Sequence, residues 1–100
     1  MKIAIASNGK DINSMVSDVA GRAPFYLIFK DKELIKTIKN PFAVGGGGAG
    51  FGVAKMLENE HVDVMIVGKI GGNMQISLDS ANIKFQSESN KSIHQIIEEL

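Results

Sequence analysis

The order of predicted elements indicates an α/β fold built on a mixed five-stranded sheet with flanking helices. Three strand-like runs come before the first helical pattern, and helices and strands alternate after it. A hairpin followed by alternating elements is typical of a sheet that is antiparallel at one edge and parallel elsewhere. Neither a repeat nor a linker divides the 100 residues, so we expect a single domain over residues 1–100.

Three strands are predicted in the first forty residues, at 2–6 (KIAIA), 25–30 (FYLIFK) and 33–39 (ELIKTIK). A polar, weakly patterned loop over residues 10–22 separates the first strand from the other two. Asp31-Lys32 is a two-residue connection, so we expect residues 25–39 to form an antiparallel hairpin. Asn40-Pro41 ends this hairpin, because proline cannot donate a hydrogen bond to a strand ladder.

The rest of the chain predicts a helix from Ala49, a strand at 62–68, a helix after Asn73, a strand at 82–86 and a last helix from Ser92. In the first helix the apolar side chains recur at helical spacing, with Val53, Met56 and Leu57 on one face. The last helix begins with a capping box, in which Ser92 and Gln95 hold the required positions. The predicted order is therefore strand-strand-strand-helix-strand-helix-strand-helix (β-β-β-α-β-α-β-α).

Composition excludes several classes of function. The formal charge is zero, because 11 Lys and Arg balance 11 Asp and Glu, so nothing draws the whole chain toward nucleic acid or anionic lipid. The absence of cysteine excludes disulfides, zinc–thiolate sites and an iron–sulfur cluster held by the chain's own thiolates. No apolar run approaches the ~20 residues that span a bilayer. We therefore expect a cytoplasmic monomer with neither a nucleic-acid nor a membrane partner.

The segment GGGGAGFG at 45–52 holds six of the chain's 11 glycines and contains the spacing G-x-G-x-x-G. A dinucleotide site also needs a strand directly before the glycines and an acidic residue about 20 positions later. Residues 40–42 separate the glycines from the preceding strand, and residues 67–71 contain no acid. The segment therefore does not predict a dinucleotide site.

Glycines at a helix start expose backbone N–H groups in the positive end of the helix dipole, which can receive an anion. Residues 71–73 (GGN) occupy the matching place, after a parallel strand and before a helix, where loops line the crevice of α/β sheets. The alternative is that both segments are ordinary connecting loops. Arg22, the only arginine, could pair with the anion, or it could be a surface residue.

Nothing in the sequence predicts catalysis. No serine lies in a nucleophile elbow, and the carboxylates show no paired pattern on the expected crevice. His61 and His94 lack a partner at metal-binding spacing and are more typical of solvated helix residues. With no acid, base or nucleophile to name, we expect that the chain is not an enzyme.

Three segments together resemble a known family: GRAPFYLI at 21–28, Asn40-Pro41 with GGGAG at 46–50, and VGKIGGN at 67–73. In this order and spacing they resemble the dinitrogenase iron–molybdenum cofactor biosynthesis family, which includes NifX-type proteins and the C-terminal part of NifB-type proteins. The resemblance runs from about residue 2 to residue 86. This chain departs from the pattern at Met74, where the family usually has alanine, and in having no cysteine or histidine inside the matched segments.

The resemblance implies an RNase H-like α/β fold and non-catalytic binding or carriage of an iron–sulfur or iron–molybdenum cofactor or its precursor. It also implies metal-cluster assembly proteins as partners. Combined with the glycine positions, it predicts that the cluster is held without covalent bonds by backbone N–H groups, with Arg22 as a counter-charge. The candidate backbone residues are Gly46, Gly47, Gly48, Gly50, Gly71, Gly72 and Asn73. The alternative function is a regulatory module that binds a small anion or phosphometabolite.

Overall fold

The computed structural model describes residues 1–44 and 49–100, and its elements follow the predicted order. The strands are β1 (Lys2–Ser7), β2 (Phe25–Lys30), β3 (Glu33–Lys39), β4 (Val64–Val67) and β5 (Lys84–Ser87). The helices are α1 (Ala49–Asn59), α2 (Gly72–Ser80) and α3 (Ile93–Glu98). The predicted β-β-β-α-β-α-β-α order is confirmed.

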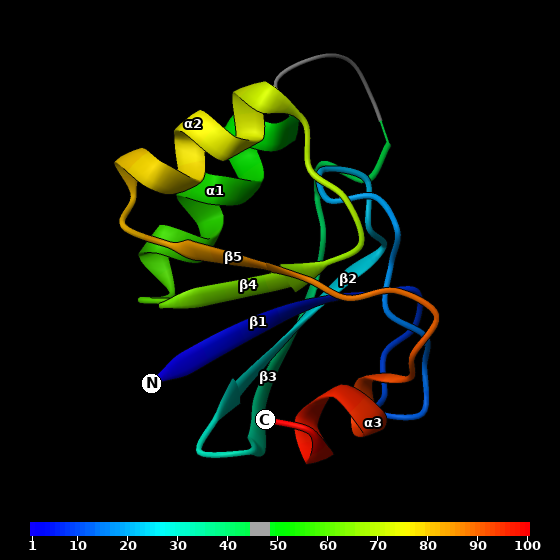
Figure 1. The fold of residues 1–100 in the computed structure, drawn as a ribbon. Helices are drawn as coiled ribbons and strands as arrows, with labels where there is room; N and C mark the ends of the chain where they lie inside the picture. The colour runs from blue at the N-terminus through cyan, green and yellow to red at the C-terminus, as the bar shows by residue number, and fades with distance from the viewer. Residues whose placement is uncertain (45–48) are drawn as a thin grey trace.

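All the described strands belong to one sheet in the order β3-β2-β1-β4-β5. β2 runs antiparallel to both β1 and β3, whereas β1, β4 and β5 are parallel to one another. Figure 1 shows α1 and α2 on one face of this sheet and α3 on the other. The mixed sheet is therefore confirmed, and so is the RNase H-like fold that the family resemblance implied.

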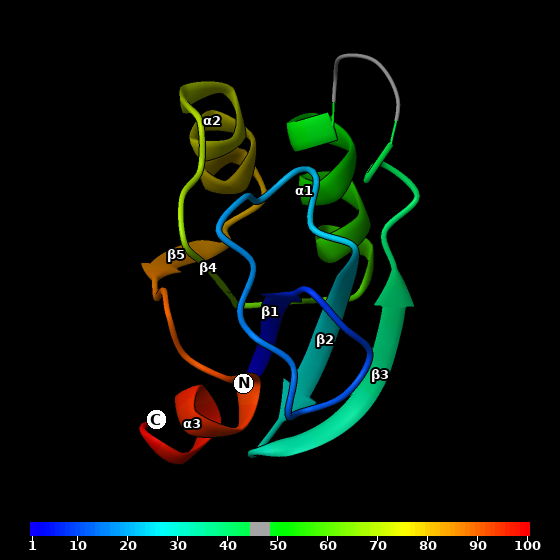
Figure 2. The ribbon, with the colours of Figure 1, turned by 90° about the vertical axis from the view of Figure 1, so that its right-hand side faces the viewer.

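Alternation along β1 explains why helices cover both faces. Ala4 and Ala6 belong to the core cluster beneath α1 and α2, whereas Ile5 belongs to the cluster beneath α3. The two alanines leave room on the first face for the large, fully buried side chains Leu57 and Leu78, one from each helix. α1 and α2 can therefore pack side by side on the same face, as Figure 2 shows.

The predicted hairpin forms around Asp31 and Lys32, which have φ angles of 51° and 68°. Two successive residues with positive φ match the twist of the flanking strands in a two-residue turn. A register shift between Ile28 and Phe29 adds a bulge to this edge of the sheet. The hairpin therefore forms without the Asn-Gly sequence that its turn prefers.

Element boundaries differ from the predictions where the turns that follow two helices delay the start of the next strand. Asn82 adopts a φ of 60°, and the N–H of Ile83 donates to the carbonyl of Leu78 at 2.9 Å, which ends α2. β5 therefore begins at Lys84 rather than at residue 82. His61 has a φ of 60° and ends α1 in the same way, so β4 begins at Val64 rather than at residue 62.

Among the described residues, no helix has the length and apolar character needed to cross a membrane.

Candidate functional site

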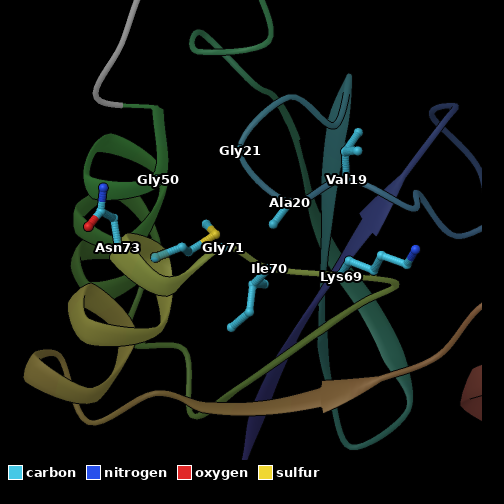
Figure 3. A pocket seen from close by; sticks show the side chains of 9 residues that line it. Val19, Ala20, Gly21, Gly50, Lys69, Ile70, Gly71 and Asn73 are labelled. Atoms are coloured by element: carbon cyan, nitrogen blue, oxygen red, sulfur yellow. The ribbon is translucent and has the colours of Figure 1, made fainter.

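A cavity of about 430 Å³ lies at the edge of the sheet where α1 and α2 begin. Its walls come from three stretches of chain that are distant in sequence: residues 19–21, Gly50 at the start of α1, and residues 69–71, 73 and 74 around the start of α2. Figure 3 shows Gly21 and Gly50 above Gly71, with Asn73 on the first turn of α2. The carboxyl end of β4 leads directly into this cavity, as expected for a crevice in an α/β sheet.

The first turn of α2 opens toward solvent and lacks a side-chain cap. Gly71 is the N-cap, with φ −83° and ψ 168°, and no side chain accepts a hydrogen bond from this turn. A Cβ atom added to Gly71 or Gly72 would meet nothing within 4 Å. Since the first N–H groups of a helix have no partner within the helix, this turn can donate hydrogen bonds to a ligand.

The electrostatic character of the cavity is set by backbone rather than by side chains. The first turns of α1 and α2 contain no acidic residue. Lys69 is the only charged residue among the described residues that line the cavity. Its side chain points away from Gly50 and Asn73, as Figure 3 shows. The positive ends of two helix dipoles therefore meet at the cavity without a carboxylate to neutralise them.

Two glycines allow these segments to come together. A Cβ on Gly21 would lie 3.1 Å from the Cβ of Ala49 and 3.4 Å from the backbone nitrogen of Gly50. A Cβ on Gly50 would lie 3.1 Å from the Cβ of Met74. Both contacts are tighter than ordinary van der Waals packing, so the wall at 19–21 and the starts of the two helices approach as closely as glycine permits.

The structure brings three of the candidate residues together. Gly50, Gly71 and Asn73 line the same cavity, whereas Gly72 begins α2 but is not among the lining residues. The candidates Gly46, Gly47 and Gly48 lie outside the described residues.

Arg22 lies next to the cavity wall but does not line the cavity. Its Nη1 donates a hydrogen bond to the carbonyl oxygen of Phe42 at 3.0 Å. The guanidinium therefore links the loop before β2 to the turn after β3.

The sequence predictions did not include Val19, Ala20, Lys69 or Ile70, all of which line the cavity. Val19 and Ala20 fall in the polar loop at 10–22, whose sequence carries no signal of their position. The loop is placed by long-range backbone pairing, because Val19 forms an isolated parallel bridge with Lys69 and the N–H of Gly68 donates to the carbonyl of Ser17 at 2.9 Å. The position of this loop beside residues 68 and 69 therefore becomes visible only in the folded structure.

The donor set of the cavity does not suit direct ligation of a metal by imidazole, thiolate or carboxylate. Across residues 1–44 and 49–100, no group of three or more such side chains could hold a metal ion. His94 pairs with Glu98 at 2.7 Å on α3, on the opposite face of the sheet, and His61 ends α1 away from the cavity. Met74, 4% exposed, supplies the only sulfur atom among the described lining residues.

A family model described as dinitrogenase iron-molybdenum cofactor matches residues 1–100. The chain belongs to this family. The resemblance of the three segments quoted above is thereby confirmed, and the family is linked to the iron–molybdenum cofactor. A comparison with curated proteins gave no match.

Solved structures support the same fold. The apo form of the orange protein from Desulfovibrio gigas superposes with a TM-score of 0.90 at 21% identity, covering 97% of this chain and 83% of that one. The NMR structure of a candidate NifB protein from Thermotoga gives a TM-score of 0.83 at 28% identity, covering 97% and 84%. This member of the dinitrogenase iron-molybdenum cofactor family therefore shares its fold with these proteins.

Proposed function

We propose that this chain binds a preassembled, anionic metal–sulfur cluster of the iron–sulfur or iron–molybdenum type and carries it without catalysing a reaction on it. The observation that carries the proposal is the meeting of two helix N-termini at one open cavity, lined by Gly50, Gly71 and Asn73. Backbone N–H groups in that position favour negative charge. Family membership supports a metal–sulfur cluster as the ligand, rather than another of the anions that such a cavity could accept.

The cluster is cargo in this proposal, and the chain's donors fit that role. The chain has no cysteine, so the cavity offers no thiolate to anchor a cluster permanently. N–H groups can donate hydrogen bonds to the sulfides of a cluster that already holds its own ligands. Such binding is reversible, which suits delivery to a partner from metal-cluster assembly. The orange protein, whose fold is shared, is described in an apo form, which is consistent with a group that can leave.

A direct test uses tetrathiomolybdate, a soluble anion of molybdenum and sulfide, added anaerobically to the ¹⁵N-labelled protein. We expect the backbone amide signals of Gly50 and of residues 71–74 to shift together in a saturable manner. Shifts confined to other regions, or none at all, would contradict the proposal. A parallel titration with phosphate and ATP tests the alternative, since a small-anion regulatory module would respond to these and not to the thiometallate.

A further inference from the structure

The loop at residues 20–23, of which Ala20 and Gly21 line the cavity, is held from inside by a buried asparagine. Asn40 is only 3% exposed, although it follows an edge strand. Its Nδ2 donates hydrogen bonds to the carbonyl oxygens of Gly21 at 2.9 Å and Ala23 at 2.8 Å. Its Oδ1 accepts one from the N–H of Phe42 at 2.9 Å. Both amide hydrogens and the amide oxygen of Asn40 are thus engaged with backbone groups.

The preceding carbonyl of the same wall is held by a second buried side chain. Tyr26 is fully buried on β2, and its hydroxyl donates to the carbonyl oxygen of Ala20. Burial raises the pKa of the Tyr26 phenol far above its usual value, so the hydroxyl stays protonated and remains a donor. Two successive carbonyl oxygens, those of Ala20 and Gly21, are therefore both committed to donors inside the protein.

These carbonyls belong to residues that line the cavity, so their direction affects what the cavity can bind. A carbonyl oxygen that faced a bound anion would repel it, because it carries partial negative charge. In a trans peptide the C=O and the following N–H point in opposite directions. When the Ala20 carbonyl turns inward to Tyr26, the N–H of Gly21 must turn away from Tyr26. Because the carbonyl oxygens of Ala20 and Gly21 accept hydrogen bonds from the core, their partial negative charges face the core rather than the cavity.

Asn40 also connects this wall to the chain that leads into α1. Its bond to the N–H of Phe42 fixes the turn after β3, and Arg22 donates to the carbonyl of the same Phe42 at 3.0 Å. Gly21 in turn lies against Ala49 and the nitrogen of Gly50 at the start of α1. A movement of Asn40 would therefore disturb the wall and its contact with the helix N-terminus together.

We propose that Asn40, assisted by Tyr26, is a positioning residue for the anion cavity. The two side chains keep the carbonyl oxygens of Ala20, Gly21 and Ala23 turned into the core, and Asn40 holds the 19–21 wall against the start of α1. The inference rests on the proposed function, because it concerns the same cavity. It adds that affinity for an anion depends on side chains that do not touch the anion.

The test compares the tetrathiomolybdate affinity of wild type, Tyr26→Phe, Asn40→Asp and the control Ile96→Val, each at a temperature where it is folded. Tyr26→Phe removes only a hydroxyl, and Asn40→Asp replaces a donor by an oxygen of nearly the same size. Ile96→Val loosens the core beneath α3, on the opposite face of the sheet, without touching the wall. It therefore shows what a general loss of stability does to binding.

We expect Tyr26→Phe to weaken binding several-fold and Asn40→Asp to weaken it by about tenfold or more, while Ile96→Val binds as wild type does. The amide signals of Gly21 and Gly50 should shift in the two wall variants before any ligand is added. If both wall variants bind as tightly as the control, the positioning role is wrong while the proposed function stands. If Asn40→Asp fails to fold, Tyr26→Phe alone decides. If wild type itself does not bind, the proposed function falls and this inference with it.

Discussion

Gly50 of α1 and Met74 of α2 approach each other so closely that a Cβ on Gly50 would lie 3.1 Å from the Cβ of Met74 and 3.5 Å from its Cα. The contact joins the second residue of α1 to the third residue of α2, so it lies in the first turn of both helices. It explains why two helix N-termini open on one cavity rather than on separate parts of the surface. The size of the side chain at position 50 therefore controls the width of the candidate site.

Replacing Gly50 by valine should push the two helix starts apart. The branched side chain has no room beside Met74, and overpacking of this kind costs about 1–3 kcal/mol of unfolding free energy. Gly72→Val is the matched control, since a Cβ on Gly72 meets nothing within 4 Å, and we expect a change within about 0.5 kcal/mol. Urea unfolding of both variants measures the difference. Equal stabilities would mean that the helix starts do not require glycine at position 50.

Met74 offers a separate test of how a cluster is held. Met74→Leu conserves volume and should cost less than about 1.5 kcal/mol, whereas Met74→Ala should cost about 2 kcal/mol or more, because Met74 is only 4% exposed. If backbone N–H groups hold the anion, Met74→Leu should bind tetrathiomolybdate as wild type does. A large loss of affinity in this well-folded variant would instead assign the thioether sulfur as a ligand.

Local sequence signals were sufficient for most of the fold, because most elements carry a recognisable pattern of apolar, capping or turn residues. The Ser92 capping box is an example: Oγ of Ser92 accepts a hydrogen bond from the N–H of Gln95 at 3.1 Å, and α3 begins at Ile93. The two-residue hairpin also formed as predicted. Errors appeared at the starts of β4 and β5, where His61 and Asn82 take the positive φ that usually marks glycine at a helix end.

The candidate site was predictable only in part, for a physical reason. Gly50, Gly71 and Asn73 follow from the rule that ligand crevices form at the carboxyl ends of strands and the starts of helices. The remaining wall comes from the loop before β2, which is placed by contacts such as the 2.8 Å bond from the N–H of Ser17 to the carbonyl of Ala6. Contacts between distant segments leave no periodic trace in the sequence, so neither the wall nor the Asn40 interactions could be foreseen.

Replacing the two residues of the β2–β3 turn by Asn-Gly, which suits its backbone conformation, should stabilise the protein. Asp31 and Lys32 both have positive φ, which costs energy in residues with a Cβ and is relieved by Asn-Gly. The double substitution Asp31→Asn with Lys32→Gly should raise the unfolding free energy by about 0.5–1 kcal/mol. Lys30→Gly, at the end of β2, is the control and should lower it by a similar amount. A drop in stability for the turn variant would show that the positive φ angles of Asp31 and Lys32 do not limit the stability of the hairpin.

A negative charge placed at the mouth of the cavity should raise the stability of the protein and lower its affinity for an anion. Gly71 is the uncapped N-cap of α2 in an extended conformation that aspartate readily adopts, and nothing lies within 4 Å of its added Cβ. Gly71→Asp should therefore stabilise the protein by about 0.5–1 kcal/mol, through a new cap and a favourable charge at the helix start. The same carboxylate should repel an anion, so tetrathiomolybdate affinity should fall by about tenfold or more.

Gly71→Asn is the neutral partner for this substitution, because its side chain can cap the helix without adding charge. We expect it to keep most of the added stability and to retain much more affinity than Gly71→Asp, especially at low salt, where the repulsion is least screened. Thermal unfolding and anaerobic titration at two salt concentrations measure both quantities. If the aspartate and asparagine variants bind equally well, negative charge at the start of α2 is irrelevant to the ligand, and the electrostatic basis of the proposed function is wrong.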